Sequence, residues 1–188
     1  MFDIGEIIKI FDGYSERYPF LVAAIDGRCA SGKSTLGGLL QAHYDCNVIP
    51  MDHFFLRTEQ RSAERLSQAG ENIDHERFLS EVLLPLSEQM EFSYRPYDCG
   101  TGELGEPIRV PQRRIYIIEG SYSCNKALWE HYHLRIFLST SPEEQLRRIK
   151  ERDGEEKLLI YKDKWIPLEE RYFAAYDIEN RCDYRFYT

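Results

Sequence analysis

The sequence predicts an α/β protein of three layers (α/β/α), in which a parallel sheet of five strands lies between helices on both faces. Three observations support this fold class. The chain has 188 residues, 43% of them hydrophobic, which suits one domain, 1–188, with a sizeable core. Short apolar segments alternate with segments of helical periodicity, and parallel strands need crossover connections that helices normally supply. A glycine-rich loop directly follows the first apolar strand and precedes a helix.

The elements of the first half follow from the spacing of apolar residues. From Ile4 to Phe11 they recur at the i, i+3, i+4, i+7 positions of an amphipathic helix, which Pro19 keeps from running on. Residues 20–25 form a continuous apolar run, typical of a strand buried on both faces of a parallel sheet. The next expected elements are helix 33–43, strand 47–51, an exposed helix or mobile arm over 58–70, and helix 76–90, which Pro85 should kink or shorten.

The second half begins with a segment of different character. Residues 93–111 contain three prolines and three glycines, too many breakers for a long element, so we expect a loop inserted over the active face. The remaining expected elements are strands 114–120 and 134–139, a charged helix 142–153, helix 168–180 and a final strand 184–187.

Composition narrows the partners and the compartment. The formal net charge of −8 argues against a nucleic acid polymer, because such binding depends on Lys and Arg that neutralise phosphates. We expect no membrane association, since no signal-peptide pattern opens the chain and its apolar runs are too short to span a bilayer. Five cysteines without a C-x-x-C pair favour reduced thiols and a cytoplasmic location. Assembly into a homo-oligomer is left open.

The glycine-rich loop carries the strongest functional signal. Residues 27–34, Gly-Arg-Cys-Ala-Ser-Gly-Lys-Ser, match the pattern G-x-x-x-x-G-K-S/T. Between a strand and a helix, this pattern predicts the P-loop NTPase fold. Backbone N–H groups of such a loop face nucleotide phosphates, while Lys33 adds positive charge and Ser34 can bind Mg²⁺. We therefore expect ATP and Mg²⁺ as cofactors. The alternative is that the loop is a turn that only joins a strand to a helix. The predicted nucleotide-binding residues are Gly27, Ala30, Ser31, Gly32, Lys33, Ser34 and Thr35.

Two carboxylates follow predicted strands, at the edge where open α/β sheets bind ligands. Asp52 could accept the proton of an attacking hydroxyl or orient Mg²⁺ through water, and its alternative role is a solvated helix N-cap. Glu119 is suited to holding Mg²⁺ through a water, and its alternative is an exposed carboxylate at a strand end. The phosphate-binding loop favours the functional interpretation of both residues.

Arg148 and Arg152 lie four residues apart and therefore share one face of the predicted helix 142–153. Two guanidinium groups could clamp a phosphoryl group during its transfer. On the residues alone, a solvated basic face interleaved with glutamates is the favoured interpretation.

Several segments together resemble the uridine kinase and phosphoribulokinase group of P-loop kinases, which also includes nicotinamide riboside kinases and bacterial pantothenate kinase. The resemblance covers nearly the whole chain. Its markers are the phosphate loop, Met51-Asp52-His53-Phe54-Phe55, Asn72-Ile73-Asp74-His75, Tyr94-Arg95-Pro96-Tyr97-Asp98, Ile118-Glu119-Gly120 and Arg148 through Asp153.

The resemblance implies that Asp52 is the catalytic base, that Asp74 binds sugar hydroxyls, and that Tyr97 helps to enclose the acceptor. Arg148 and Arg152 look like the lid arginines of the family. Without the resemblance, an N-cap of the following helix is the favoured interpretation of Asp74. The parts of the domain that the resemblance implies are a helical lid at 142–165 and an acceptor-side insertion at 93–111.

The expected activity is transfer of the γ-phosphoryl group of ATP to a hydroxyl of a nucleoside, similar to uridine or cytidine, or of a related small molecule. Similar uridine kinases place a base-contacting histidine five residues after the tyrosine that matches Tyr97, and here that position is Gly102. Acceptors similar to nicotinamide riboside or pantothenate are therefore alternatives. Residues 165–169 resemble a bacterial uridine kinase-like branch. A nucleotide-dependent regulatory switch is a further alternative, which the segment 125–128 weakens because it lacks the Asp of the N-K-x-D pattern.

Overall fold

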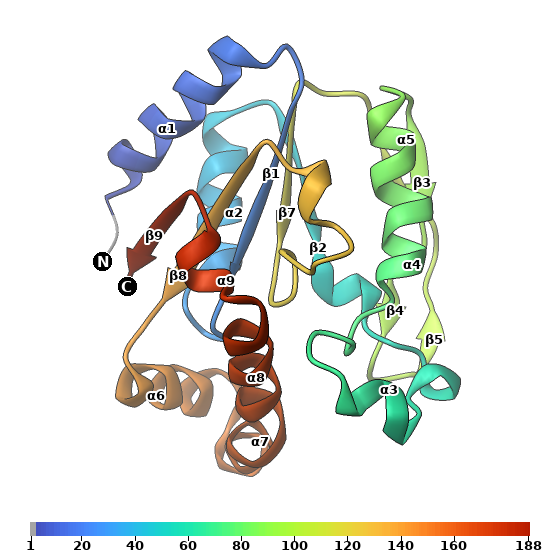
Figure 1. Cartoon of the computed structure of the whole chain (residues 1–188), viewed down its shortest axis with the longest axis vertical. Coiled ribbons are helices and arrows are strands. Elements are labelled where there is room, and N and C mark those ends of the chain that lie inside the picture. The colour runs from blue at the N-terminus through green and yellow to red at the C-terminus, as the bar shows by residue number, and fades with distance from the viewer. Residues whose placement is uncertain (1–2) are drawn as a thin grey trace.

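The computed structural model describes residues 3–188, and its centre is a sheet of five parallel strands in the order β2-β7-β1-β8-β9 (Figure 1). This confirms the predicted five-stranded parallel sheet. Because the strands are parallel, their carboxyl ends share one edge, which faces the lower half of the view in Figure 1. The strands are β1 (Leu21–Gly27), β2 (Cys46–Pro50), β7 (Ile115–Glu119), β8 (Leu134–Ser139) and β9 (Tyr184–Tyr187).

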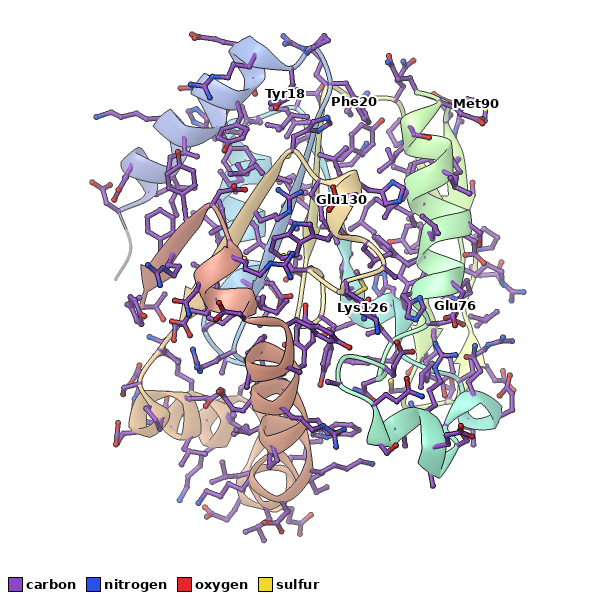
Figure 2. The ribbon with its side chains drawn as sticks, in the orientation of Figure 1. Tyr18, Phe20, Glu76, Met90, Lys126 and Glu130 are labelled. Atoms are coloured by element: carbon purple, nitrogen blue, oxygen red, sulfur yellow. The ribbon has the colours of Figure 1, made fainter. Side chains whose placement is uncertain are left out.

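The sheet is covered by helices on both faces, and every residue of β1 is buried. Alternate β1 side chains reach two separate apolar clusters. One cluster includes Leu21 and packs beneath α1 (Ile4–Arg17) and α2 (Lys33–His43). The other includes Val22 and packs against the helices on the opposite face. Side chains fill the space between sheet and helices (Figure 2). The three-layer prediction is confirmed.

The helix predicted at 76–90 has a local change of winding. It consists of α4 (His75–Phe78), a π-helical turn η3 (Leu79–Leu83) and α5 (Leu84–Ser87). Pro85 has no N–H and its ring would meet the carbonyl four residues earlier in a regular α-helix. The wider π turn just before Pro85 accommodates both effects, so the helix continues instead of breaking.

Two expectations for the polar and glycine-rich segments need correction. Segment 58–70 contains a 3₁₀ turn, η2 (Thr58–Gln60), and one short helix, α3 (Ala63–Ser67). Segment 93–111 is not a plain loop, because β3 (Phe92–Tyr94) pairs with β6 (Ile108–Val110), and β4 (Tyr97–Asp98) pairs with β5 (Glu103–Leu104). The prolines and glycines lie between these short ladders, where turns need them.

The C-terminal third is more helical than expected. After α6 (Pro142–Asp153), Gly154 turns the chain at φ 86° into α7 (Glu155–Ile160) and a π-helical turn η5 (Tyr161–Trp165), which the sequence analysis did not resolve. The helix predicted at 168–180 is split into α8 (Ile166–Tyr176) and α9 (Ile178–Arg181) by Asp177 in the left-handed region, at φ 51°. Short 3₁₀ turns follow β2 (η1, Met51–Phe54) and precede β8 (η4, Trp129–His131). Within residues 3–188 no helix is both long and apolar enough to cross a membrane.

Candidate active site

The phosphate-binding loop lies between β1 and α2, as predicted, and its backbone is tightly folded. Gly27 has φ 136°, and a Cβ on it would lie 1.9 Å from the carbonyl oxygen of Leu138, so only glycine fits there. Gly32 has φ 93° and Ala30 has φ 59°. Gly27 is therefore required by its close approach to β8, and Gly32 is favoured by its left-handed backbone conformation.

The loop offers hydrogen-bond donors suited to an anion. The N–H groups of Lys33, Ser34 and Thr35 precede the first bond into α2, which the Leu36 N–H donates to the Gly32 carbonyl. The buried hydroxyl of Ser31 has no hydrogen-bond partner in the described part of the chain. An unpaired buried hydroxyl beside a helix N-terminus fits a bound phosphate group.

Lys33 is held over the loop by three oxygens. Its Nζ donates to the carbonyls of Gly27 (2.7 Å) and Arg28 (2.9 Å) and to Ser121 Oγ (3.4 Å), and only 8% of the residue is exposed. The ammonium group thus lies at the mouth of the loop, where it can meet phosphate oxygens.

Ser34 and Glu119 form an oxygen pair suited to a divalent cation. Ser34 Oγ donates to Glu119 Oε2 over 3.1 Å, and Glu119 is 6% exposed at the end of β7. Burial raises the pKa of Glu119, and the negative charge of Asp52 raises it further. Hard carboxylate and hydroxyl oxygens are the ligands that Mg²⁺ prefers, and a cation here would offset both effects.

These groups open onto one cleft of about 1300 Å³ at the carboxyl edge of the sheet. The cleft brings together the predicted loop residues Ala30, Ser31, Gly32, Lys33, Ser34 and Thr35 with Asp52, Glu119, Arg148 and Arg152. Asp52 follows β2 and is exposed, and a Cβ on Gly120 would be 3.5 Å from its Oδ1. Asp52 therefore lies beside the end of β7, next to the Ser34–Glu119 pair.

Both predicted arginines reach this cleft from α6. Arg148 Nε donates to Glu144 over 2.7 Å, and its second nitrogen donates to the Ala30 carbonyl over 3.2 Å, so Arg148 already touches the loop. Arg152 donates to Asp153 (2.8 Å) and to the Tyr161 hydroxyl (3.1 Å). Residues of α6 and of the turn η5 thus supply one wall of the cleft.

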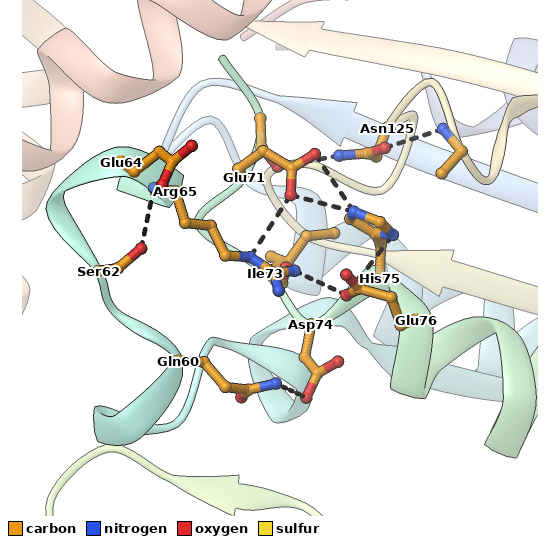
Figure 3. Close-up of polar contacts among 12 residues, drawn as sticks. Gln60, Ser62, Glu64, Arg65, Glu71, Ile73, Asp74, His75, Glu76 and Asn125 are labelled. Carbon is orange, nitrogen blue, oxygen red and sulfur yellow. Dashed lines mark hydrogen bonds and ion pairs between the residues drawn. The ribbon is translucent and has the colours of Figure 1, made fainter. Parts of the chain in front are cut away.

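Two predicted acceptor-binding residues do not line the cleft. Asp74 is 2% exposed and caps α4, since its Oδ1 accepts from the Arg77 N–H (3.0 Å) and its Oδ2 from Gln60 Nε2 (2.8 Å; Figure 3). Tyr97 is 4% exposed, with the Arg61 guanidinium 5.9 Å from its ring. Gly102, with φ 76°, lies at the exposed turn between β4 and β5. Acceptor contacts by Asp74 and Tyr97 stay predictions.

Sequence reasoning missed Asp26, which organises the loops around the phosphate site. Its carboxylate is fully buried and accepts from the N–H groups of Tyr122 (3.1 Å) and Cys124 (2.8 Å) and from the Tyr172 hydroxyl (2.9 Å). Burial raises the pKa of Asp26 to about 6, although these hydrogen bonds oppose the rise. A carboxylate inside an apolar strand, just before the glycine-rich loop, was the available signal.

Glu169 was also missed, and it connects α8 to the phosphate loop. Its Oε2 accepts from the Cys29 N–H over 3.0 Å, and its Oε1 accepts from Ser121 Oγ over 2.7 Å. Glu169 is only 6% exposed. The segment 165–169 was noted only for its resemblance to a bacterial uridine kinase-like branch, and its local pattern does not indicate this contact, because the contact joins residues 140 positions apart.

Comparisons with known proteins agree with this fold. No protein-family model and no curated protein matches the chain. A solved structure described as a possible uridine kinase from Bacillus stearothermophilus matches with 18% identity and a TM-score of 0.65, over 95% of this chain and 99% of that one. D-glycerate 3-kinase from Cryptococcus neoformans matches with 14% identity and a TM-score of 0.65, over 98% of this chain and 93% of that one. The chain therefore has a three-layer α/β/α P-loop NTPase fold.

Proposed function

We propose that this protein is an ATP- and Mg²⁺-dependent phosphotransferase that moves the γ-phosphoryl group of ATP to a hydroxyl of a small acceptor molecule. The observation that carries the proposal is the arrangement of the cleft. Lys33 and Ser34 of the phosphate loop, the strand-end carboxylate Asp52, and the arginines Arg148 and Arg152 all line it. A site of this kind works mainly by positioning and charge neutralisation.

The nucleotide would be held by the loop. The N–H groups at the start of α2, the Ser31 hydroxyl and the Lys33 ammonium face its phosphates in this assignment. Ser34 would hold Mg²⁺ directly and Glu119 through a water. When bound, the ion neutralises charge on the β- and γ-phosphate oxygens.

Asp52 would accept the proton of the acceptor hydroxyl, which leaves that oxygen free to attack phosphorus. Its exposure to the cleft, beside the metal-binding pair, suits this role. Arg148 and Arg152 would balance the charge of the group in transfer. Arg152 would exchange its present contacts with Asp153 and Tyr161 for the phosphoryl oxygens as the lid closes.

The names of the two structural neighbours, a possible uridine kinase and D-glycerate 3-kinase, both describe kinases, which supports a kinase of a small molecule. A nucleoside is the first acceptor class to test, with Asp74 and Tyr97 as its proposed contacts. A non-nucleoside acceptor is the second class. The observation that favours it is Gly102, since the position where similar uridine kinases have a base-contacting histidine carries no side chain and lies outside the cleft.

The test is Asp52→Asn, with radiolabelled ATP and a panel of nucleosides, nicotinamide riboside and pantothenate. We expect the variant to bind ATP normally in calorimetry but to lose about 10²–10⁴-fold in transfer rate, because the amide cannot take the proton. Asp45→Asn, an exposed carboxylate paired with Arg113 away from the cleft, is the matched control. Full transfer by Asp52→Asn would contradict the assignment. ATP turnover stimulated by a protein and by no small molecule would favour a regulatory switch.

A further inference from the structure

Arg61 stands out among the residues that line the cleft on the side of Asp52. It follows η2, is half-buried, and shares this part of the cleft with Phe55, Asn72 and Cys99. Its Nε donates to the Leu56 carbonyl over 2.8 Å, which fixes the plane of the guanidinium group. Arg61 is not among the predicted nucleotide-binding residues, which line the same cleft from the phosphate loop.

The charge of Arg61 has no carboxylate partner among residues 3–188. Its guanidinium also neighbours the ring of Tyr97, whose centroid lies 5.9 Å from the guanidinium carbon, and the thiol of Cys99. The negative charges of Asp52 and Asp98 both raise the pKa of the Cys99 thiol, yet neither carboxylate forms an ion pair with Arg61. The guanidinium therefore faces the cleft with its terminal nitrogens free of any acidic side chain.

Within residues 3–188, Arg61 is the one half-buried arginine without a carboxylate partner, because every other half-buried arginine has a carboxylate within 4.0 Å. Those arginines are Arg28, Arg57, Arg65, Arg77, Arg113, Arg135 and Arg148. The arginines without such a partner are otherwise exposed to solvent. A partly desolvated cation is costly unless an anion compensates it, so the free guanidinium indicates an anionic ligand.

We propose that Arg61 binds an anionic group, a carboxylate or a phosphate, on the acceptor molecule, whose hydroxyl then lies toward Asp52. This proposal rests on the proposed phosphotransferase function and narrows its substrate class to hydroxylated anions. A guanidinium group can hold either anion through two parallel hydrogen bonds. Asn72, which is 8% exposed at the same wall, supplies a neutral amide beside it.

The first test needs no turnover and uses Cys99 as a probe. Cys99 is exposed beside Arg61, whereas the other four cysteines are buried. Its thiolate displaces iodide from iodoacetate, which is anionic, or from iodoacetamide, which is neutral. Because both reagents need the thiolate, the ratio of their rate constants cancels any change in the thiol pKa. We expect Arg61→Met to lower the iodoacetate-to-iodoacetamide ratio about three- to tenfold at low salt, because the attraction of the anion is lost.

Arg95→Met is the matched control for this measurement. Arg95 lies close in sequence to Cys99, just before β4, and donates to the carbonyls of Leu104 and Gly105. It is exposed and does not line the cleft. Arg95→Met changes the net charge by the same amount as Arg61→Met, and it should leave the iodoacetate-to-iodoacetamide ratio at the wild-type value. Cys99→Ser should abolish labelling. An unchanged ratio in Arg61→Met overturns the anion site. If Arg61→Met does not fold, the wild-type protein is labelled with iodoacetamide in the presence of inorganic phosphate or of sodium chloride at equal ionic strength. We expect phosphate to slow the labelling more than sodium chloride does. Equal slowing overturns the anion site.

The second test measures turnover with acceptor pairs in which one member carries a carboxylate or phosphate and the other carries a neutral amide or hydroxyl in its place. Suitable pairs are nicotinate riboside with nicotinamide riboside, pantothenate with pantothenol, glycerate with glycerol, and ribulose 5-phosphate with ribulose. We expect the anionic member of the active pair to have the higher kcat/KM, and the active pair distinguishes carboxylate from phosphate. Arg61→Met should raise the KM for that acceptor about 10- to 100-fold with little change in kcat, and Arg61→Lys should restore part of the loss.

The two tests separate the proposals. A charge-dependent labelling ratio with no turnover on any pair supports the anion site and counts against the phosphotransferase. Turnover that prefers the neutral members, with a KM insensitive to Arg61→Met, overturns the anion site and leaves the phosphotransferase standing. If Arg61 only ties its loop to Tyr97, Arg61→Met would lower the melting temperature without changing the labelling ratio or the acceptor KM, and this result overturns the anion site.

Discussion

At the residue scale, Asp26 is the carboxylate on which the loops after β1 and β7 converge. It binds three backbone N–H groups, of Gly27, Tyr122 and Cys124, and the Tyr172 hydroxyl. These donors make its charge tolerable, yet burial still raises its pKa from 3.8 to about 6. The folded protein therefore holds this proton more tightly than the unfolded chain does.

This difference predicts a pH dependence of stability. Between pH 3.8 and about 6 the folded state binds more protons at Asp26 than the unfolded state, so the free energy of unfolding falls as pH rises through this window and stays lower above it. The shift of about 2 pH units corresponds to at most about 3 kcal/mol. Urea unfolding of wild type and Asp26→Asn at pH 4 to 6.5 measures it, because subtracting the variant removes the other titrating groups. A constant difference between the two proteins would refute the raised pKa.

Asp74 also carries a prediction at this scale. Because both of its oxygens are occupied in capping α4 and binding Gln60, Asp74→Ala should lower the free energy of unfolding by about 1–2 kcal/mol. If Asp74 acts only as a cap, the acceptor KM should change little. Thermal melts and steady-state kinetics on the same preparation check both. A raised KM in a variant of unchanged stability would instead support contact with sugar hydroxyls. Glu64→Ala, an exposed carboxylate in α3, is the control.

At the element scale, Arg28 joins the end of β1 to the C-terminal helices. It forms ion pairs with Glu170 of α8 (2.7 Å) and Glu179 of α9 (3.0 Å), donates to Ser139 Oγ, and lies near the ring of Phe173. The sequence analysis gave this variable loop position no role. Its contacts instead make it the cross-link that holds α8, with Glu169, against the phosphate loop.

Arg28→Met should therefore lower the free energy of unfolding by about 1–3 kcal/mol and increase hydrogen exchange in α8, because the half-buried network loses its only cation. Arg147→Met is the contrasting variant. Arg147 pairs with Glu144 and Glu151, but its side chain is 54% exposed, so its removal should lower the free energy of unfolding much less than the removal of Arg28. Equal losses in the two variants would show that burial does not set the strength of these ion pairs.

At the scale of the whole molecule, ligand binding should stabilise the fold through the cleft that joins its parts. Mg²⁺-ATP at a concentration of 100 times its Kd should add about 2.7 kcal/mol to the free energy of unfolding, which is a rise of about 5–10 °C in Tm for a chain of this size. Lys33→Ala should lose most of this rise, because its Nζ lies at the mouth of the loop. Lys9→Ala, on the exposed face of α1, should keep the full rise in Tm. A full rise in Lys33→Ala, measured by thermal shift, would place the nucleotide elsewhere.

The sequence by itself determined the five strands, the phosphate loop and the helix after it, because these depend on local patterns. A continuous apolar run such as 20–25 is stable only when buried on both faces, and the loop pattern fixes its own backbone through its glycines. The positions of Asp52 and Glu119 at one edge of the sheet followed from parallel strands alone. The cleft therefore gathers six of the seven predicted loop residues, all but Gly27, with two carboxylates and two arginines.

Only the tertiary structure decided which side chains lack partners and which are already occupied. Asp26 and Glu169 bind donors far away in the chain, and Asp74 caps α4 with one oxygen and binds Gln60 with the other. Arg61 is the half-buried arginine without an acid in residues 3–188. Burial and pairing are sums over contacts from distant segments, which no local pattern encodes. The same reason explains the paired strands within 93–111, since a short ladder forms only when both of its strands are brought together.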